Sequence, residues 1–287
     1  MQPNEMMLGL VSWIPLYMTG HIFSYYLEGN NNLIYCHTDY VSGETALSGE
    51  CLRGYHKEGK YYLTQQKQEL EYYHKRASRL LAKAQPLMRT FKADQREAYQ
   101  AFENTASLLE GERHYILSSL PLHTMPDEVL EDLFRLHHFN EEEQALVLAD
   151  RVRQRYILQT ILKNNNVVMD IPYFPAEDFK QHPLSVPFHS LPTKKIPTYT
   201  YEQYQIHLRA TQELTDQYPG YQLKRLPISP FKNIQICIHS GKWVVVSKNN
   251  APEIHFVIHH PKMLQAFEHF QFPMNDEDPF LNPKATD

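Results

Sequence analysis

The chain has 287 residues, of which 42% are hydrophobic, and a formal net charge of -5 at pH 7. This length exceeds that of most single domains and predicts two domains with ordinary globular cores. The negative charge argues against a protein that coats nucleic acid, although it is compatible with a local basic patch. Cys36, Cys51 and Cys237 are widely spaced and form no C-x-x-C pair. This spacing disfavours zinc fingers and a disulfide framework and indicates free thiols in a reducing cytoplasm.

The first feature in chain order is an uncharged stretch, residues 6–27, without Asp, Glu, Lys or Arg. It is long enough to raise the question of a membrane span. However, Pro15, Gly20 and several tyrosines interrupt it, and Glu5 stands before it where a signal peptide has basic residues. We therefore expect two core strands here, no membrane segment and a cytoplasmic location.

Residues 1–64 have the pattern of a small β module. Ile22–Leu27 and Leu33–Cys36 flank the polar run Glu28–Asn32, which predicts a hairpin. A second turn at Lys57–Lys60 precedes a short strand at Tyr61–Leu63. We find no pair of short helices joined by a Gly-type turn, as a helix-turn-helix requires, which argues against direct DNA binding.

Residues 65–110 form a predicted helical segment. Its apolar positions are spaced alternately three and four residues apart, as in a coiled-coil seam, and are Leu70, Tyr73, Ala77, Leu80, Ala84, Leu87 and Phe91. This seam predicts a homodimer. Packing within one chain is the alternative, since Pro86 would kink a continuous helix. We interpret the basic row beside the seam (Lys75, Arg79, Lys83) as solvated, and expect a further helix over Asp94–Leu109, ended by Gly111.

Residues 111–274 alternate between strands and helices. His114–Leu120 reads as a strand, and helices follow from Asp127 to Leu136 and, capped by Asn140, to about Leu162. The short apolar run Val167–Ile171 is then a second strand. A strand, helices and another strand form a crossover, so these two strands are predicted to be parallel neighbours.

The rest of this region closes the sheet. A Pro-rich loop with a short helix at Ala176–Gln181 leads to a helix over Tyr201–Tyr218 and a strand at Tyr221–Leu226. Ile234, Ile236 and Ile238 then alternate with Gln235 and Cys237, which predicts a strand with one buried face. Two more strands (Trp243–Val246, Ile254–Ile258) and a helix after Pro261 complete a β-β-β-α unit, and residues 275–287 are predicted to be a flexible tail. The predicted fold class is α+β or α/β, with a mixed sheet.

Several runs together resemble a known family. They are Tyr115–Leu122, Arg151–Arg155, the strand ending at Pro172, Asn233–Val246 and His255–Ile258. Over roughly residues 111–270, the chain is similar to the C-terminal effector-sensing portion of bacterial helix-turn-helix transcription regulators, in which a phospholipase-D-like α/β domain serves as a sensor. The resemblance implies a non-enzymatic regulatory role, and without a helix-turn-helix before the sensor it implies regulation through a partner.

Phospholipase-D-like enzymes use an H-x-K motif followed by an acid. His260-Pro261-Lys262 matches H-x-K, but Phe267 stands where the acid is expected, and one such match is expected by chance in a chain with sixteen His. A phosphodiesterase-like enzyme built on His260 and Lys262 is therefore the alternative function, and an interaction adaptor without a ligand is a third. His255 and His259 lie about 13 Å apart on one strand face, too far to share a zinc ion. We expect no cofactor.

The candidate ligand site follows from the predicted parallel strands. In open α/β sheets, ligands bind beyond the carboxyl ends of such strands. The carboxyl end of one strand carries Ser118, Ser119 and His123, and that of the other carries Asp170. These hydroxyls, imidazole and carboxylate suit a small polar molecule. Together with His260 and Lys262 they are the candidate ligand-binding residues, while ordinary loop capping is the alternative role for the groups at the strand ends.

Overall fold

The computed structural model describes residues 12–27, 34–52, 54–164, 166–172, 179, 183–186, 188, 195–225, 234–248 and 251–270. The chain divides into two compact units: a small one, residues 23–87, and a large one formed by residues 1–22 and 88–287. This division differs from the expected boundaries, because the predicted helical segment 65–110 is split. Its first helix belongs to the small unit and its second helix to the large unit.

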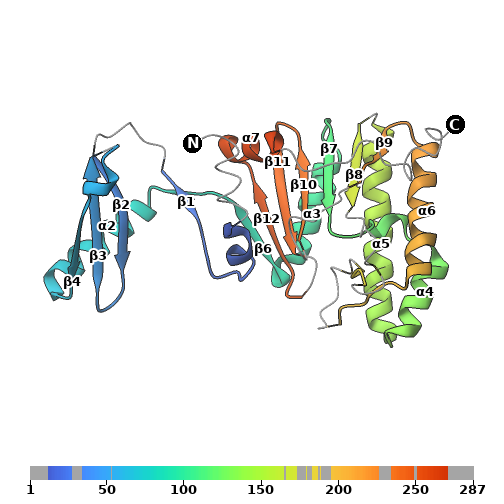
Figure 1. Ribbon diagram of the computed structural model, residues 1–287, viewed down its shortest axis with the longest axis horizontal. Coiled ribbons are helices and arrows are strands. Elements are labelled where there is room, and N and C mark those ends of the chain that lie inside the picture. Colours follow the sequence, from blue (N-terminus) through green and yellow to red (C-terminus); the bar gives the residue numbers. More distant parts are fainter. Residues whose placement is uncertain are drawn as a thin grey trace. The chain divides into compact units, whose positions relative to one another are not determined.

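The small unit has an antiparallel three-stranded sheet, in the order β2 (Ile34–Val41), β3 (Ala46–Leu52) and β4 (Lys60–Thr64), followed by helix α2 (Lys67–Leu81) (Figure 1). The predicted hairpin of the first two runs is wrong: strand β1 (Tyr25–Tyr26) pairs with β5 (Gln85–Pro86). The strand that begins at Ile34 pairs instead with β3, across a turn in which Ser42 N–H donates to the Thr45 carbonyl at 2.8 Å.

Helix α2 is shorter than the predicted seam. It ends at Leu81, and Phe91 lies buried in strand β6 (Arg89–Lys92) of the large unit rather than on the helix. Pro86 explains the difference, because proline lacks the N–H that a helix needs and disfavours helical backbone in the residue before it. The prediction of one three-heptad helix is therefore wrong. No residue of α2 is buried, so its apolar side chains remain accessible.

The large unit is built on a seven-stranded mixed sheet, in the order β6-β12-β11-β10-β7-β8-β9. Three neighbouring strands are parallel: β7 (Arg113–Leu117), β8 (Val168–Pro172) and β9 (Tyr221–Leu223). The other neighbours are antiparallel: β10 (Ile234–His239), β11 (Trp243–Lys248), β12 (Ile254–Ile258) and β6. This arrangement confirms the mixed sheet, the parallel pair and the β-β-β-α unit.

The helices of the large unit are α3 (Arg96–Ser107), α4 (Asp127–Leu136), α5 (Glu141–Lys163), α6 (Tyr201–Gln217) and α7 (Pro261–His269), with short 3-10 helices at η2 (Ala93–Gln95) and η3 (Leu122–Thr124). The predicted cap of α5 is confirmed: the Asn140 side chain accepts a 2.9 Å hydrogen bond from Glu143 N–H. α3 ends before Gly111, as predicted. Gly111 has a φ of +133°, and a Cβ atom at this position would fall 2.6 Å from His239 Nε2, so a larger residue is excluded.

Two further expectations need correction or fall outside the described residues. Residues 12–17 are helical, so β1 supplies the one strand among the described residues of the uncharged stretch. Within the parts of the chain that the structure describes, no helix is long and apolar enough to cross a membrane. The predicted short helix at 176–181 lies mostly outside the described residues, and the predicted tail at 275–287 lies entirely outside them.

The alternation predicted for β10 is present, because its isoleucines are buried and Gln235 and Cys237 are half-buried. The half-buried face is nevertheless covered as well. Cys237 packs with Phe102 against the cluster that contains Tyr99 of α3 and Trp243 of β11. On β12, Phe256 contacts the Tyr17 ring, whereas Val257, its neighbour on the other face, belongs to the Tyr99 cluster. Gln235, which alternates like Cys237, therefore also faces the α3 side of the sheet.

Candidate functional site

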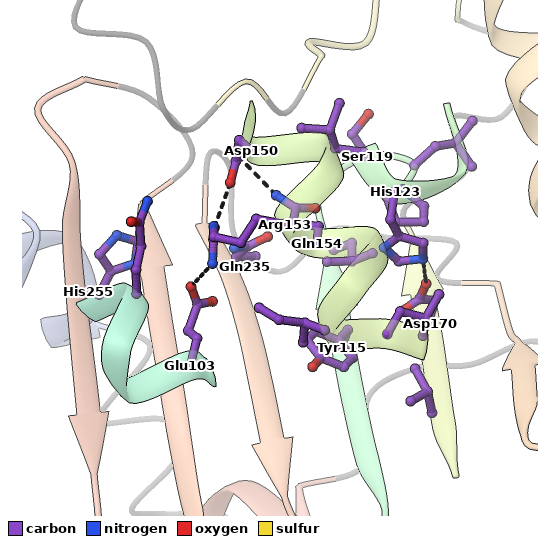
Figure 2. A pocket seen from close by; sticks show the side chains of 18 of the residues that line it. Glu103, Tyr115, Ser119, His123, Asp150, Arg153, Gln154, Asp170, Gln235 and His255 are labelled. Carbon is purple, nitrogen blue, oxygen red and sulfur yellow. Dashed lines mark hydrogen bonds and ion pairs between the residues drawn. The ribbon is translucent and has the colours of Figure 1, made fainter. Parts of the chain in front are cut away.

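A cavity of about 110 Å³ lies between the sheet, α3 and α5, beside the carboxyl end of β7 (Figure 2). Several water molecules or a small organic molecule fit in such a volume, because about 10–15 Å³ suffices for one water. Its polar lining comes from α3 (Arg96, Gln100, Glu103), α5 (Asp150, Arg153, Gln154), the segment after β7 (Ser118, Ser119, His123), and the sheet and its loops (Tyr115, Asp170, Gln235, Glu253, His255).

The structure brings together four of the six predicted site residues. Ser118, Ser119, His123 and Asp170 all line this cavity. His260 and Lys262 are not among its lining residues: His260 is the N-terminal cap of α7, and Lys262 is exposed in the first turn of that helix. The H-x-K pair is thus separate from the cavity.

Asp170 anchors one end of the cavity. Its Oδ2 atom lies 3.2 Å from His123 Nε2 and also accepts a short hydrogen bond from the Tyr221 hydroxyl. Burial, and then the charge of Asp170, raise the pKa of Tyr221 well above its usual value, so this phenol stays protonated and continues to donate. Asp170 sits in the middle of β8, with its carboxylate committed to these two partners. His123 Nε2 is buried at ion-pair distance from Asp170 and has no hydrogen-bond partner among the described residues.

A second network crosses from α3 to α5. Arg153 donates to Asp150 at 2.5 Å and forms a short ion pair with Glu103, while Gln154 donates to the other Asp150 oxygen at 3.1 Å. Burial raises the pKa of Glu103, and the nearby guanidinium of Arg153 opposes this rise. Burial lowers the pKa of Arg153, but the negative charges and hydrogen bonds of Glu103 and Asp150 have a larger effect and raise this pKa above its usual value. The two helices are thus joined by a permanently charged guanidinium.

A third network lies on the opposite wall. The Glu253 carboxylate accepts a 2.8 Å hydrogen bond from Arg96 Nε and lies 2.8 Å from His255 Nε2. The other ring nitrogen of His255, Nδ1, lies 2.8 Å from Ser247 Oγ. The Tyr99 ring stacks on the His255 ring, with centroids 3.6 Å apart and planes inclined by 7°. Burial raises the pKa of Glu253, but hydrogen bonding and charge from His255 and Arg96 outweigh it, so the pKa falls below its usual value. This carboxylate stays ionised.

Some polar groups of the lining remain unused by the protein. The side-chain amides of Gln100 and Gln235 form no hydrogen bond with any described part of the chain. Arg153 Nε is buried and likewise has no partner among the described residues. The two amides each offer a donor and an acceptor to a molecule inside the cavity.

Sequence reasoning missed the larger part of the lining. Glu103, Asp150 and Arg153 sit on two helices whose crossing cannot be read from either helix alone. Gln235 and His255 did carry a signal, because both are polar positions that alternate with buried apolar residues in strands. No group of three or more described His, Cys, Asp or Glu side chains is placed to hold a metal ion.

No family model, curated protein or solved structure matches this chain.

Proposed function

We propose that the protein is a non-enzymatic regulatory protein that senses a small polar molecule in the cavity between α3, α5 and the sheet. The observation that carries the proposal is a cavity whose charged groups are held in three networks, while the amides of Gln100 and Gln235 stay unpaired within the described chain. Charged groups that are already fixed lose little conformational entropy on binding, which favours affinity and selectivity.

The proposed regulatory role draws on three further features. The resemblance of residues 111–270 to effector-sensing domains implies a sensor that acts through a partner. A ligand that bridges α3, α5 and β10 would change the packing of these elements, which is the kind of differential contact that shifts a conformational equilibrium. Cys237 is a free thiol, as expected for the cytoplasmic location that we propose.

A thermal-shift screen with small polar metabolites tests the proposal. A ligand at a hundredfold excess over its Kd stabilises the native state by about 2.7 kcal/mol, which raises the Tm by several degrees. The discriminating variant is Gln235→Leu. Because the Gln235 amide has no partner in the described chain, this substitution should change the free energy of unfolding by less than about 0.5 kcal/mol and still remove the Tm shift.

Gln222→Leu is the matched control, because Gln222 is an exposed residue of β9 that does not line the cavity. The expected result is a ligand-induced shift in the wild type and in Gln222→Leu, but not in Gln235→Leu. A hit that shifts all three proteins equally contradicts the proposed site, and a broad screen without a single hit contradicts the sensing function.

A second proposal concerns assembly: we propose that the small unit joins two copies of the chain. Its surface exposes many apolar and aromatic side chains, which are Tyr40, Leu52, Tyr55, Tyr61, Tyr62, Leu63, Tyr72, Leu80 and Leu81. Single exposed apolar residues are common, but such a concentration within one small unit is typical of an interaction surface. The part of the predicted seam that α2 retains, Leu70 to Leu80, lies on the same unit.

A further inference from the structure

The outward face of helix α5 is apolar along most of its length. Between the two ends of the helix, its exposed positions carry no charged side chain and are Ala145, Leu148, Ala149, Val152, Tyr156 and Gln159. Leu148, Val152 and Tyr156 are 39%, 63% and 63% exposed and follow one another at intervals of four residues, so they form one row on the helix. A surface helix usually presents charged or polar residues to solvent. Helix α6 does so, with Glu202, Arg209, Glu213 and Asp216 among its exposed positions.

Charged residues stand at the two ends of this apolar face. Glu141 begins α5 and Lys163 ends it, and both side chains are exposed. Neither forms an ion pair with another described residue. Each lies eleven residues from Val152, which corresponds to about three helical turns and therefore to the same side of the helix. Leu148 and Tyr156 lie four residues from Val152, one on either side. The face is thus centred on Val152, with opposite charges at its two ends.

Such a face is complementary to itself after a half-turn. In a two-fold interface, each residue contacts a position on the other copy that contacts it in return. Two antiparallel α5 helices related by an axis beside Val152 would set Glu141 of each copy opposite Lys163 of the other. The same axis sets Leu148 opposite Tyr156. The small side chains of Ala145 and Ala149 allow the two helices to approach closely, at the 8–10 Å between axes that is typical of packed helices.

We propose that α5 packs antiparallel against α5 of a second copy of this chain. A helix of another protein would need an apolar row of the same length and the reverse order of charges, and a second copy supplies both. Asp150, Arg153 and Gln154 of the same helix line the cavity, so the ligand site and the association face share one element.

The α5 contact is smaller than a standard interface, which buries about 800 Å² and 20–30 residues on each partner. It also has fewer exposed apolar side chains than the small unit, for which a separate pairing is proposed above. The α5 pairing is therefore the weaker of the two and forms at high protein concentration. Where both occur, α5 joins two dimers into a tetramer.

Sedimentation velocity tests this pairing at protein concentrations from about 1 μM to about 1 mM, the range in which weak complexes form. The mass of the wild-type assembly should double towards the upper end of this range. Val152→Lys places two lysines against each other across the two-fold axis and should weaken this association at least about tenfold. Leu136→Lys, the same addition of a charge at an exposed apolar residue of α4, is the matched control and should associate like the wild type.

An exchange of charges tests the antiparallel register. Glu141→Lys sets a lysine opposite Lys163 of the second copy, and Lys163→Glu sets a glutamate opposite Glu141, so each variant alone should associate about three- to tenfold more weakly. In an equimolar mixture, one copy of each variant meets opposite charges at both ends, and the association should return to about the wild-type strength. Glu202→Lys, the same change in the first turn of α6, should have no effect.

Recovery in the mixture would support the antiparallel pairing, because mixing cannot repair a defect within a single copy. The proposal is overturned if the largest assembly is equal in the wild type and Val152→Lys, or if the mixture associates as weakly as each variant alone. Neither result bears on the sensing function, since Glu141, Val152 and Lys163 do not line the cavity. The pairing of the small unit is likewise tested separately, by Leu80→Lys.

Discussion

Acid should destabilise this protein through buried histidines that stay neutral, and His207 of α6 shows the largest effect. The side chain is fully buried, with Nδ1 lying 2.9 Å from the Tyr199 hydroxyl and Nε2 lying 2.9 Å from Thr124 Oγ1 and 3.1 Å from the Pro121 carbonyl. A neutral imidazole with its proton on Nε2 satisfies this set, because Nδ1 then accepts from Tyr199. His207 thus ties α6 to the segment after β7 that carries Ser118, Ser119 and His123.

Burial lowers the pKa of His207 from 6.5 to about 3, although the Pro121 carbonyl opposes part of this change. Between these values the unfolded chain binds a proton that the folded protein does not, so stability falls as the pH falls below 6.5. The slope approaches about 1.4 kcal/mol per pH unit, and the accumulated loss is about 2.7 kcal/mol at pH 4.5 relative to neutral pH. This stability is fully present above pH 6.5.

Urea denaturation of the wild type and His207→Gln at pH 7.5, 6.5, 5.5 and 4.5 measures this loss. Glutamine keeps one donor and one acceptor but does not titrate, so the variant should start less stable and then lose about 2.7 kcal/mol less than the wild type by pH 4.5. His21→Gln, at an exposed position, should follow the wild type. Parallel curves for the wild type and His207→Gln would refute the account of His207 as a buried neutral side chain.

Three further predictions concern other parts of the molecule. Asp170→Ala should lower the free energy of unfolding by about 1–3 kcal/mol, because it leaves the buried Tyr221 hydroxyl without its acceptor. The surface variant Asp132→Ala should lower it by less than about 0.5 kcal/mol. Equal losses for the two variants in urea denaturation would contradict this prediction. Burial raises the pKa of the Cys237 thiol to about 12, so mass spectrometry after iodoacetamide treatment at pH 8 should find Cys237 modified in urea but not in the folded protein. Leu80→Lys, on the exposed surface of α2, should turn a dimer into a folded monomer in light scattering, and a wild type that is monomeric at high concentration would end the dimer proposal.

Local patterns predicted much of the large unit. The alternation in Ile234–His239, the β-branched run after Trp243 and the Pro261 start of the last helix each depend on near neighbours, and the structure confirms all three. Long-range pairing was beyond the same reasoning. The partner of Tyr25–Tyr26 is Gln85–Pro86, at the other end of the small unit's sequence. The sequence pattern instead favoured a partner strand that begins within ten residues of Leu27.

The cavity likewise combines positions that local sequence patterns predict with contacts that depend on distant segments. The predicted crossover places the parallel strands side by side, and so the position of Ser118 and Asp170 near one another could be inferred. Gln235 was interpreted as a residue of an uncovered sheet face, since alternation shows that two faces differ but not what covers each of them. α3 covers that face, and this contact depends on packing between segments more than a hundred residues apart.

The most direct test of the central claim is a crystal structure of the protein with the strongest ligand from the thermal-shift screen. The account predicts density for the ligand between α3, α5 and β10, in contact with the Gln235 amide and the Glu103–Arg153 network. Ligand density elsewhere, such as beside His260 and Lys262 at the start of α7, with the cavity filled by water alone, would contradict it.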